Sequence, residues 1–355
     1  MNNYDPIALA EKLRPRMIDL KNKKFLLAVL AGTGQAQDLT QERFFKDIFR
    51  SKIYTKKEDL QRDPFRREPA AIAAKKLTIP GKTLVSPEEC NAAFLGQLNG
   101  CNLKCWYCYV DDKAKGANKK HGEFSSAEEY LIQFIIESRK NQNSLNQDLK
   151  LNVLRISGGE VFIVPEIIVW MIEAVEKFGL KDSIYLWVDC NLSTGNFYWK
   201  YLSEIQREKI RNFKNLGVCV CYKGFDEESF QENTCGATPE SFNKAFLMHK
   251  RLIDEGLDVY SYLYPVTSST DNIENRIRNF INRLQKEVDE CAPLRMATPP
   301  IKLYGPTKER LNENHSVALE NQWIVMNIIK NELGRKFNSR ELTLYPHEIP
   351  VKTRL

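Results

Sequence analysis

The 355-residue chain lacks several features that would narrow its class at once. No run of apolar residues is long enough to cross a bilayer, so a membrane protein is not expected. No internal repeat and no low-complexity tract is visible. With only four histidines, all isolated, the sequence offers no Ser-His-Asp arrangement, and it has no phosphate-binding P-loop. These absences argue against a triad hydrolase and a P-loop nucleotidase.

Disulfide scaffolding is also missing. The nine cysteines are an odd number, and they are not spread in the regular manner of a secreted disulfide framework. A cytoplasmic, reducing compartment is therefore expected. Residues 21–36 resemble a signal peptide in composition, with lysines before a short apolar run. Because this run begins only at residue 21, it predicts a buried helix or strand instead.

Charge is uneven along the chain. The net charge is +6, and residues 1–80 hold 17 Lys and Arg against 10 Asp and Glu. The densest part is 51–69, which has two interpretations. It could form a patch for an acidic partner such as RNA. Because acids are interleaved with the bases, it could equally be a solvated helix face.

The pattern of apolar residues divides the chain into three parts. Residues 1–89 read as a basic, mainly helical N-terminal extension. Over 90–304, apolar runs recur about every thirty residues, each followed by an amphipathic helical pattern. Residues 305–355 form a short C-terminal extension with one helix and a final strand. The predicted strands are 92–98, 151–157, 183–189, 216–222, 257–264, 298–304 and 341–346, and the predicted helices are 125–139, 165–178, 238–255, 271–290 and 319–333.

Six strand–helix units in alternation predict an α/β fold. Several strand candidates are almost continuously apolar, as expected when both faces of a parallel sheet are covered. We expect a partial (β/α)6 TIM-like barrel, in which the loops after the strands gather at one rim and bind ligands.

The stretch "NGCNLKCWYCYV", residues 99–110, places Cys101, Cys105 and Cys108 in a C-x3-C-x2-C spacing just after the first core strand. Three soft thiolates suit an iron–sulfur cluster or zinc. A cubane cluster has four corners, so one iron would lack a protein ligand. A zinc site would need a fourth ligand from elsewhere, for which His121 is a candidate.

This spacing resembles the signature of the radical S-adenosylmethionine (SAM) superfamily, C-x3-C-x-aromatic-C, with Tyr107 at the aromatic position. The resemblance covers roughly residues 90–300 and implies two cofactors, a [4Fe–4S] cluster and SAM. In that superfamily the open iron binds the amino and carboxylate groups of SAM, and reductive cleavage releases a 5′-deoxyadenosyl radical that abstracts hydrogen from a substrate. It also implies an electron donor of the flavodoxin or ferredoxin type.

A second motif, "ISGGEV", follows the second core strand. The glycines Gly158 and Gly159 let a backbone edge approach a ligand, and Glu160 can pair with an ammonium. With Ser157, these residues resemble the superfamily's GGE segment, which holds the SAM amino group. Tyr107 would then lie near the adenine.

Two later strand ends resemble the subgroup that includes pyruvate formate-lyase activating enzyme. "LWVDCNLS" offers Asp189 and Asn191 for the ribose or methionine end of SAM, although Cys190 and Leu192 stand where Thr and Gly are usual. The other interpretation is a helix cap at a strand end. "VCYKGF" offers Lys223 for the SAM carboxylate.

The subgroup implies a partner polypeptide, as in glycyl-radical activation, or a small molecule as substrate. Two alternatives stay open. One is the same chemistry on RNA, gripped by the basic N-terminal segment; the other is a non-catalytic interaction protein stabilised by zinc or a cluster. Cys219 with Cys221, and Tyr260 with Tyr262 and Tyr264, share strand faces and are expected to be core residues.

Overall fold

A computed structural model describes residues 3–35, 43–45, 49–54, 91–144, 150–344 and 346–351. Most of the basic segment 51–69 lies outside these residues, and so does Cys90. The interpretation of that segment as an RNA-binding patch therefore remains a prediction, as do the three domain boundaries.

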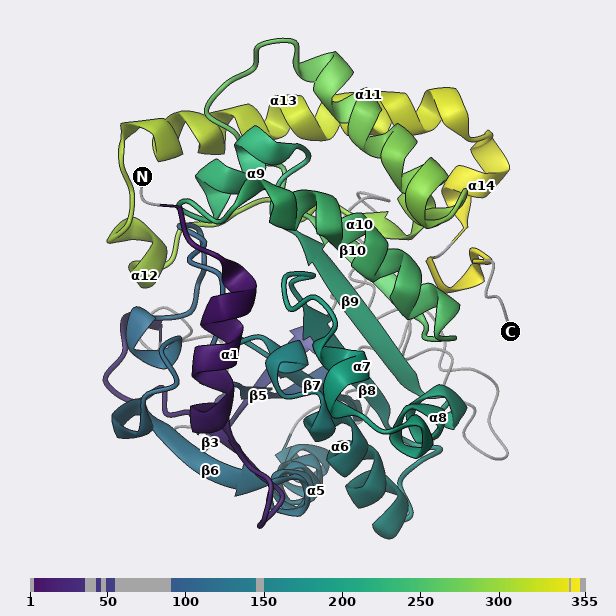
Figure 1. Cartoon of the computed structure of the whole chain (residues 1–355). Helices are drawn as coiled ribbons and strands as arrows, with labels where there is room; N and C mark the ends of the chain where they lie inside the picture. The colour runs from purple at the N-terminus through teal and green to yellow at the C-terminus, as the bar shows by residue number, and fades with distance from the viewer. Residues whose placement is uncertain are drawn as a thin grey trace.

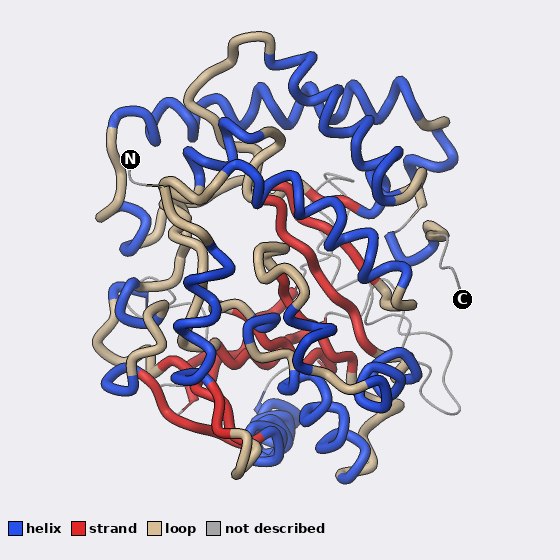
Figure 2. Tube along the Cα trace, in the orientation of Figure 1, coloured by secondary structure: helices blue, strands red, loops and turns tan. Residues whose placement is uncertain are grey.

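Eight strands form one sheet in the order β11-β10-β9-β8-β7-β5-β4-β3 (Figures 1 and 2). From β5 to β11 neighbouring strands are parallel, whereas β3 and β4 extend the β5 edge antiparallel. The six parallel strands confirm the α/β class and the partial barrel. The strands are β3 Arg43–Phe45, β4 Phe49–Tyr54, β5 Asn91–Gln97, β7 Lys150–Ser157, β8 Tyr185–Cys190, β9 Leu216–Tyr222, β10 Val259–Leu263 and β11 Met296–Ala297.

Five of the six predicted core strands are confirmed, and the sixth is wrong. The strand predicted at 298–304 is a loop, and β11 comprises only the two residues before it. Pro299 and Pro300 explain the difference, because proline has no N–H to donate to a strand ladder.

The strand predicted at 341–346 is also wrong. The first residues of this segment form the end of the helix α14 Ser339–Thr343. Asn338 and Glu341 cap it reciprocally, with the Asn338 side chain accepting from the Glu341 N–H at 3.0 Å and the Glu341 carboxylate from the Asn338 N–H at 2.8 Å. This capping box stabilises a helix at a place where a short alternation of apolar and polar residues had predicted a strand.

The prediction of a mainly helical N-terminal part stays a prediction, because most of residues 36–89 lie outside the described residues. Within the described part, the structure gives the bounds of the helix α1 Pro6–Met17 and of four strands. After α1, the strands β1 Ile18–Asp19 and β2 Lys24–Ala28 form a small antiparallel sheet with β6 Gly122–Ser126. The apolar run in 21–36 therefore becomes a buried strand, one of its two predicted outcomes.

Helices connect the parallel strands and cover one face of the sheet (Figure 1). The predicted helices at 125–139, 165–178, 238–255 and 271–290 are confirmed, and the apolar stripe of the last one is buried. Its end, Leu284–Val288, is a π-helical turn. The connecting helices are α5 Ala127–Ser144, α6 Glu166–Lys177, α7 Phe197–Tyr201, α8 Glu204–Asn212, α9 Glu227–Asn233, α10 Pro239–Asp254 and α11 Ile273–Arg283.

The C-terminal extension begins with a short helix, α12 Gly305–Lys308, and continues with the long helix α13 Glu313–Lys336, which runs along α11 (Figure 1). The helix predicted at 319–333 lies within α13. None of the helices among the described residues is both long and apolar enough to span a bilayer.

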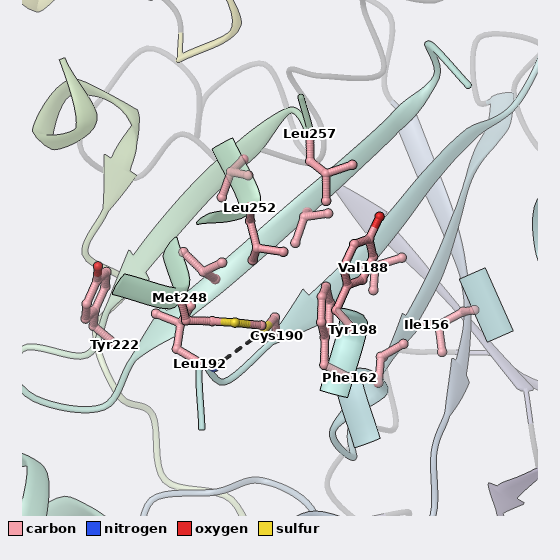
Figure 3. Close-up of a cluster of buried hydrophobic side chains, with 14 of the residues drawn as sticks. Ile156, Phe162, Val188, Cys190, Leu192, Tyr198, Tyr222, Met248, Leu252 and Leu257 are labelled. Atoms are coloured by element: carbon pink, nitrogen blue, oxygen red, sulfur yellow. Dashed lines mark hydrogen bonds between the residues drawn. The ribbon is translucent and has the colours of Figure 1, made fainter. Parts of the chain in front are cut away.

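Side chains of the parallel strands alternate between two buried clusters. Val188 and Cys190 of β8 pack in the helix-covered cluster (Figure 3), whereas Trp187 points to the other face of the sheet. The second cluster contains strand residues alone: Val153, Tyr185, Trp187, Cys219, Cys221, Tyr260, Tyr262 and Ala297, with Tyr264 packed against it. We call this concave side the inner face; its tyrosines and cysteines pack together as expected for core residues.

Candidate active site

The cysteine loop, residues 99–110, follows β5 at the carboxyl end of the sheet. Cys105 is buried, Cys101 and Cys108 are half-buried, and all three are free thiols. The Cys108 N–H donates to the Cys105 carbonyl at 3.2 Å, which tightens the second half of the loop into a turn. The three predicted ligands therefore lie together in one compact loop.

The glycine pair after β7 brings a second turn against this loop. Gly158 has φ of +89°, which favours glycine. A Cβ on Gly159 would lie 2.3 Å from the Gly100 carbonyl oxygen and 2.7 Å from that of Leu98. The Glu160 N–H donates to the same Gly100 carbonyl at 2.8 Å. The sequence predicted that the glycine turn would approach a ligand closely. In the structure, the turn packs closely against the backbone of the cysteine loop.

Glu160 is buried and links two strand ends. Its carboxylate accepts from the Phe162 N–H at 2.9 Å and from the Asn191 N–H at 2.7 Å. Burial raises the pKa of this carboxyl to about 8, although the two backbone N–H donors and the charge of Lys223 act in the opposite direction. Each carboxylate oxygen has a second lone pair, so the group can still accept from a ligand ammonium.

Asn191 also contacts the cysteine loop. Its side-chain amide donates to the side-chain oxygen Oδ1 of Asn102 at 2.9 Å and lies 3.7 Å from the Cys101 sulfur. Leu192 has φ of +61°, which explains why glycine would be favoured there, and its N–H donates to the Cys190 sulfur at 3.3 Å (Figure 3). Asn191 is therefore placed beside the predicted ligands.

Asp189 lies on the inner face and already has a cationic partner. Arg155 of β7 forms an ion pair with it at 2.9 Å, and the Trp187 indole N–H donates to it at 3.0 Å. Sequence reasoning missed Arg155, although a lone charge inside the apolar strand "LNVLRIS" was a signal. Asp189 is near the site, but both partners compete with a ligand for its oxygens.

Lys223 follows β9 on the inner face, with its ammonium 4.6 Å from the centre of the Tyr264 ring. Burial alone would lower the pKa of Lys223, but the neighbouring Cys221 thiol and tyrosine phenols raise it above its ordinary value. Among the described residues no carboxylate lies within ion-pair distance of this ammonium. Lys223 is half-buried, and a partly desolvated cation without an anion favours an anionic ligand.

Tyr107 packs against Tyr264, with ring centres 5.0 Å apart, and so joins the cysteine loop to the Lys223 neighbourhood. Its hydroxyl is buried and has no hydrogen-bond partner among the described residues. Ser157 lies at the end of β7, its hydroxyl 3.4 Å from that of Tyr109. The structure therefore brings ten of the eleven predicted residues around one loop, with Asp189 held aside by Arg155.

The thiols have the chemistry of a cluster site. Burial raises the pKa of Cys101 to about 11, with a contribution from Cys108, and raises that of Cys105 to about 12. Crowded buried thiols of this kind become thiolate ligands when a cation neutralises them. Among the described residues, no three His, Cys, Asp or Glu side chains meet closely enough to hold a single metal ion, His121 included. A cubane cluster binds each thiolate through a different iron, so its three cysteines need not converge on one metal ion.

Several residues that sequence reasoning missed hold the loop in place. The Tyr4 hydroxyl accepts from the Lys104 N–H at 3.0 Å, and the Asn102 amide donates to the Pro6 carbonyl at 3.0 Å. Trp106 donates through its indole N–H to Asn233 at 3.1 Å. These partners come from segments remote in sequence, so no local pattern marked them.

Curated proteins that are similar in sequence to this chain share one name. No family model matches the chain. It is 26% identical over 239 residues to a probable GTP 3′,8-cyclase of Methanococcus maripaludis strain C7, covering 66% of this chain and 63% of that protein. A protein of the same name from strain S2 is 24% identical over 240 residues, 67% of each chain. The chain thus spans less than two thirds of the first relative.

Solved structures show weaker likenesses. Streptococcus suis SuiB bound to S-adenosylmethionine has a TM-score of 0.42 at 12% identity, covering 67% of this chain and 46% of that one. The cobalamin-dependent S-adenosylmethionine radical enzyme OxsB has a TM-score of 0.37 at 11% identity, covering 67% and 30%. None of these names points to the activating-enzyme subgroup. The cysteine loop with its packed Gly-Gly-Glu turn, and the sequence likeness to the cyclases, support assigning the chain to the radical SAM superfamily.

Proposed function

We propose that the chain is a radical SAM enzyme. Cys101, Cys105 and Cys108 would hold three irons of a [4Fe–4S] cluster and leave the fourth for SAM. When bound, the cluster supplies the electron that cleaves SAM to methionine and a 5′-deoxyadenosyl radical. The observation that carries the proposal is the packing of the Gly-Gly-Glu turn onto the cysteine loop. Lys223, which has no carboxylate within ion-pair distance among the described residues, adds a half-buried cation near the same loop.

Opposite charges at the two strand ends would orient the methionine part of SAM. Glu160 would bind its ammonium, which would lower the raised pKa of that carboxyl. Lys223 would bind its carboxylate and gain the anion that it lacks. The glycine turn and Ser157 would line the same edge.

The remaining predicted residues would enclose the adenosine part. Tyr107 would flank the adenine, and its buried hydroxyl would find a partner in the ligand. Asn191 would reach the ribose. Asp189 could do so only by sharing its carboxylate with Arg155, so we propose it as the weakest of these contacts.

The substrate would enter from the inner face, where Tyr264 and Lys223 lie beside the cysteine loop. The name of the relatives favours a small molecule, and GTP is the first nucleotide to try. A partner polypeptide, as in glycyl-radical activation, is the other class that the proposal allows. Reduction would come from a flavodoxin- or ferredoxin-type donor.

Anaerobic reconstitution tests the proposal. The chain is loaded with iron and sulfide, mixed with dithionite and SAM, and analysed for 5′-deoxyadenosine and methionine. We expect both products, and we expect Cys105→Ala to abolish product and cluster together. Cys291→Ala is the matched control, because Cys291 lies before β11 at the opposite end of the sheet. A chain that binds one equivalent of zinc and yields no product would refute the proposal.

A further inference from the structure

The C-terminal extension, which carries none of the predicted motifs, contacts the cysteine loop directly. Arg310 lies between α12 and α13. Its guanidinium donates to the Cys108 carbonyl at 2.6 Å and to the Val110 carbonyl at 2.8 Å. It thereby binds the backbone of the last of the three cysteines, from a segment about two hundred residues later in the sequence.

Arg310 is itself held in one orientation. Asp112 accepts from its Nε at 3.2 Å and from an Nη at 2.9 Å, a two-point ion pair that a lysine cannot form. The Arg310 side chain is 16% exposed, whereas that of Asp112 is 70% exposed. Solvent therefore screens the charge of the aspartate more than that of the guanidinium.

The first residue of α13 that faces the loop adds a second contact. The His315 ring stacks on Trp106 with ring centres 4.2 Å apart and planes within 5°. The His315 Nδ1 lies 3.0 Å from the Arg310 carbonyl, so the two contacts are joined. Trp106 stands between Cys105 and Tyr107. Both ends of the Cys105–Cys108 turn are thus held by the same segment.

A second cation lies on the same side of the loop. The Lys115 side chain is 12% exposed and pairs with Asp112 through a close contact. Its carbonyl accepts from the Cys101 N–H at 3.0 Å. Two cations, Arg310 and Lys115, therefore share the exposed Asp112 carboxylate beside the thiols.

A positive charge near a cluster stabilises the added electron, and hydrogen bonds around the ligands orient them. We propose that Arg310 is a positioning residue for the cluster. It holds Cys108 in place, and its charge makes the reduction potential less negative, so that a donor can reduce the cluster. This inference rests on the proposed function, because it concerns the cluster that the three cysteines would bind.

The test compares Arg310→Met and Arg310→Lys with Arg335→Met in the full-length, reconstituted chain. Arg335 is the matched control, since its side chain is 61% exposed and pairs with Glu332 away from the loop. The measurements are the midpoint potential by EPR-monitored titration, the rate of iron loss to a chelator, and the unfolding temperature.

We expect Arg310→Met to shift the potential to more negative values and to speed iron loss several-fold. Arg310→Lys should keep a reduction potential near that of the wild type, because it keeps the positive charge. It should still lose iron faster, because an ammonium cannot reproduce the several directed hydrogen bonds of the guanidinium. Arg335→Met should match the wild type in both measurements.

An unchanged potential in Arg310→Met would overturn the inference, even if the unfolding temperature falls, since a merely structural role predicts that pattern. If Arg310→Met does not fold, the Arg310→Lys variant decides: equal iron retention would overturn the inference. A wild-type chain that takes up no iron would refute the proposed function itself. That failure is distinct, because it precedes any comparison of variants.

Discussion

Gly159 shows at the scale of one residue how the sequence motif works. We expect Gly159→Ala to destabilise the chain by about 2 kcal/mol, because the new Cβ would meet two backbone carbonyls that cannot turn aside. Urea unfolding of the iron-free protein measures this. Gly116→Ala is the matched control, since nothing lies within 4 Å of its Cβ position, and it should change stability by less than about 0.5 kcal/mol. Equal stability of the two variants would contradict the account.

The sequence predicted most of the site's residues but not their protein partners. Cysteine spacing and the Gly-Gly-Glu turn are local patterns, and both marked residues that the structure brings together. Arg155 was missed because its role depends on Asp189 of the neighbouring strand. Single-residue chemistry is readable from sequence when it depends on spacing along the chain, and much less so when it depends on strand neighbours.

At the scale of elements, α1 is docked on the start of α6 by a buried ion pair. Arg14 forms a two-point contact with Glu166 and donates to the Ile163 carbonyl at 2.8 Å. Arg14→Met should lower the free energy of unfolding by about 3 kcal/mol, because it leaves Glu166 buried without a cation. Urea unfolding measures the loss.

Two comparisons make this prediction specific. Arg16→Met removes the same charge from an exposed position of α1 and should change stability by less than about 0.5 kcal/mol. Adding Glu166→Gln to Arg14→Met should recover part of the loss, since the buried charge is then gone. A double variant less stable than Arg14→Met alone would contradict the ion-pair explanation.

Elements with strong local signals were predicted well. The buried parallel strands are continuous apolar runs, and the α11 stripe has a clear helical period. The failures, at 298–304 and 341–346, are short segments in which two prolines or a capping box outweighed apolar alternation. For β2 the sequence left helix and strand open, because the strand depends on pairing with β6, about a hundred residues later.

At the scale of the whole molecule, the N-terminal segment and the segment from α12 to the start of α13 both contact the cysteine loop. Tyr4 holds it from the N-terminal side, and Arg310 with His315 holds it from the C-terminal side. Such contacts span one hundred residues of sequence or more, so no local periodicity predicts them. They support the proposal that segments outside the parallel sheet keep the thiols in position.

The central claim is that one iron of a three-cysteine cluster is left for SAM. The most direct measurement is electron–nuclear double resonance on the reduced cluster with SAM labelled by ¹⁵N at its amino group or ¹⁷O at its carboxylate. The account predicts hyperfine coupling of both labels to the cluster, and loss of the ¹⁷O coupling in Lys223→Met. A cluster whose signal is unaltered by SAM, with no coupling to either label, would contradict it.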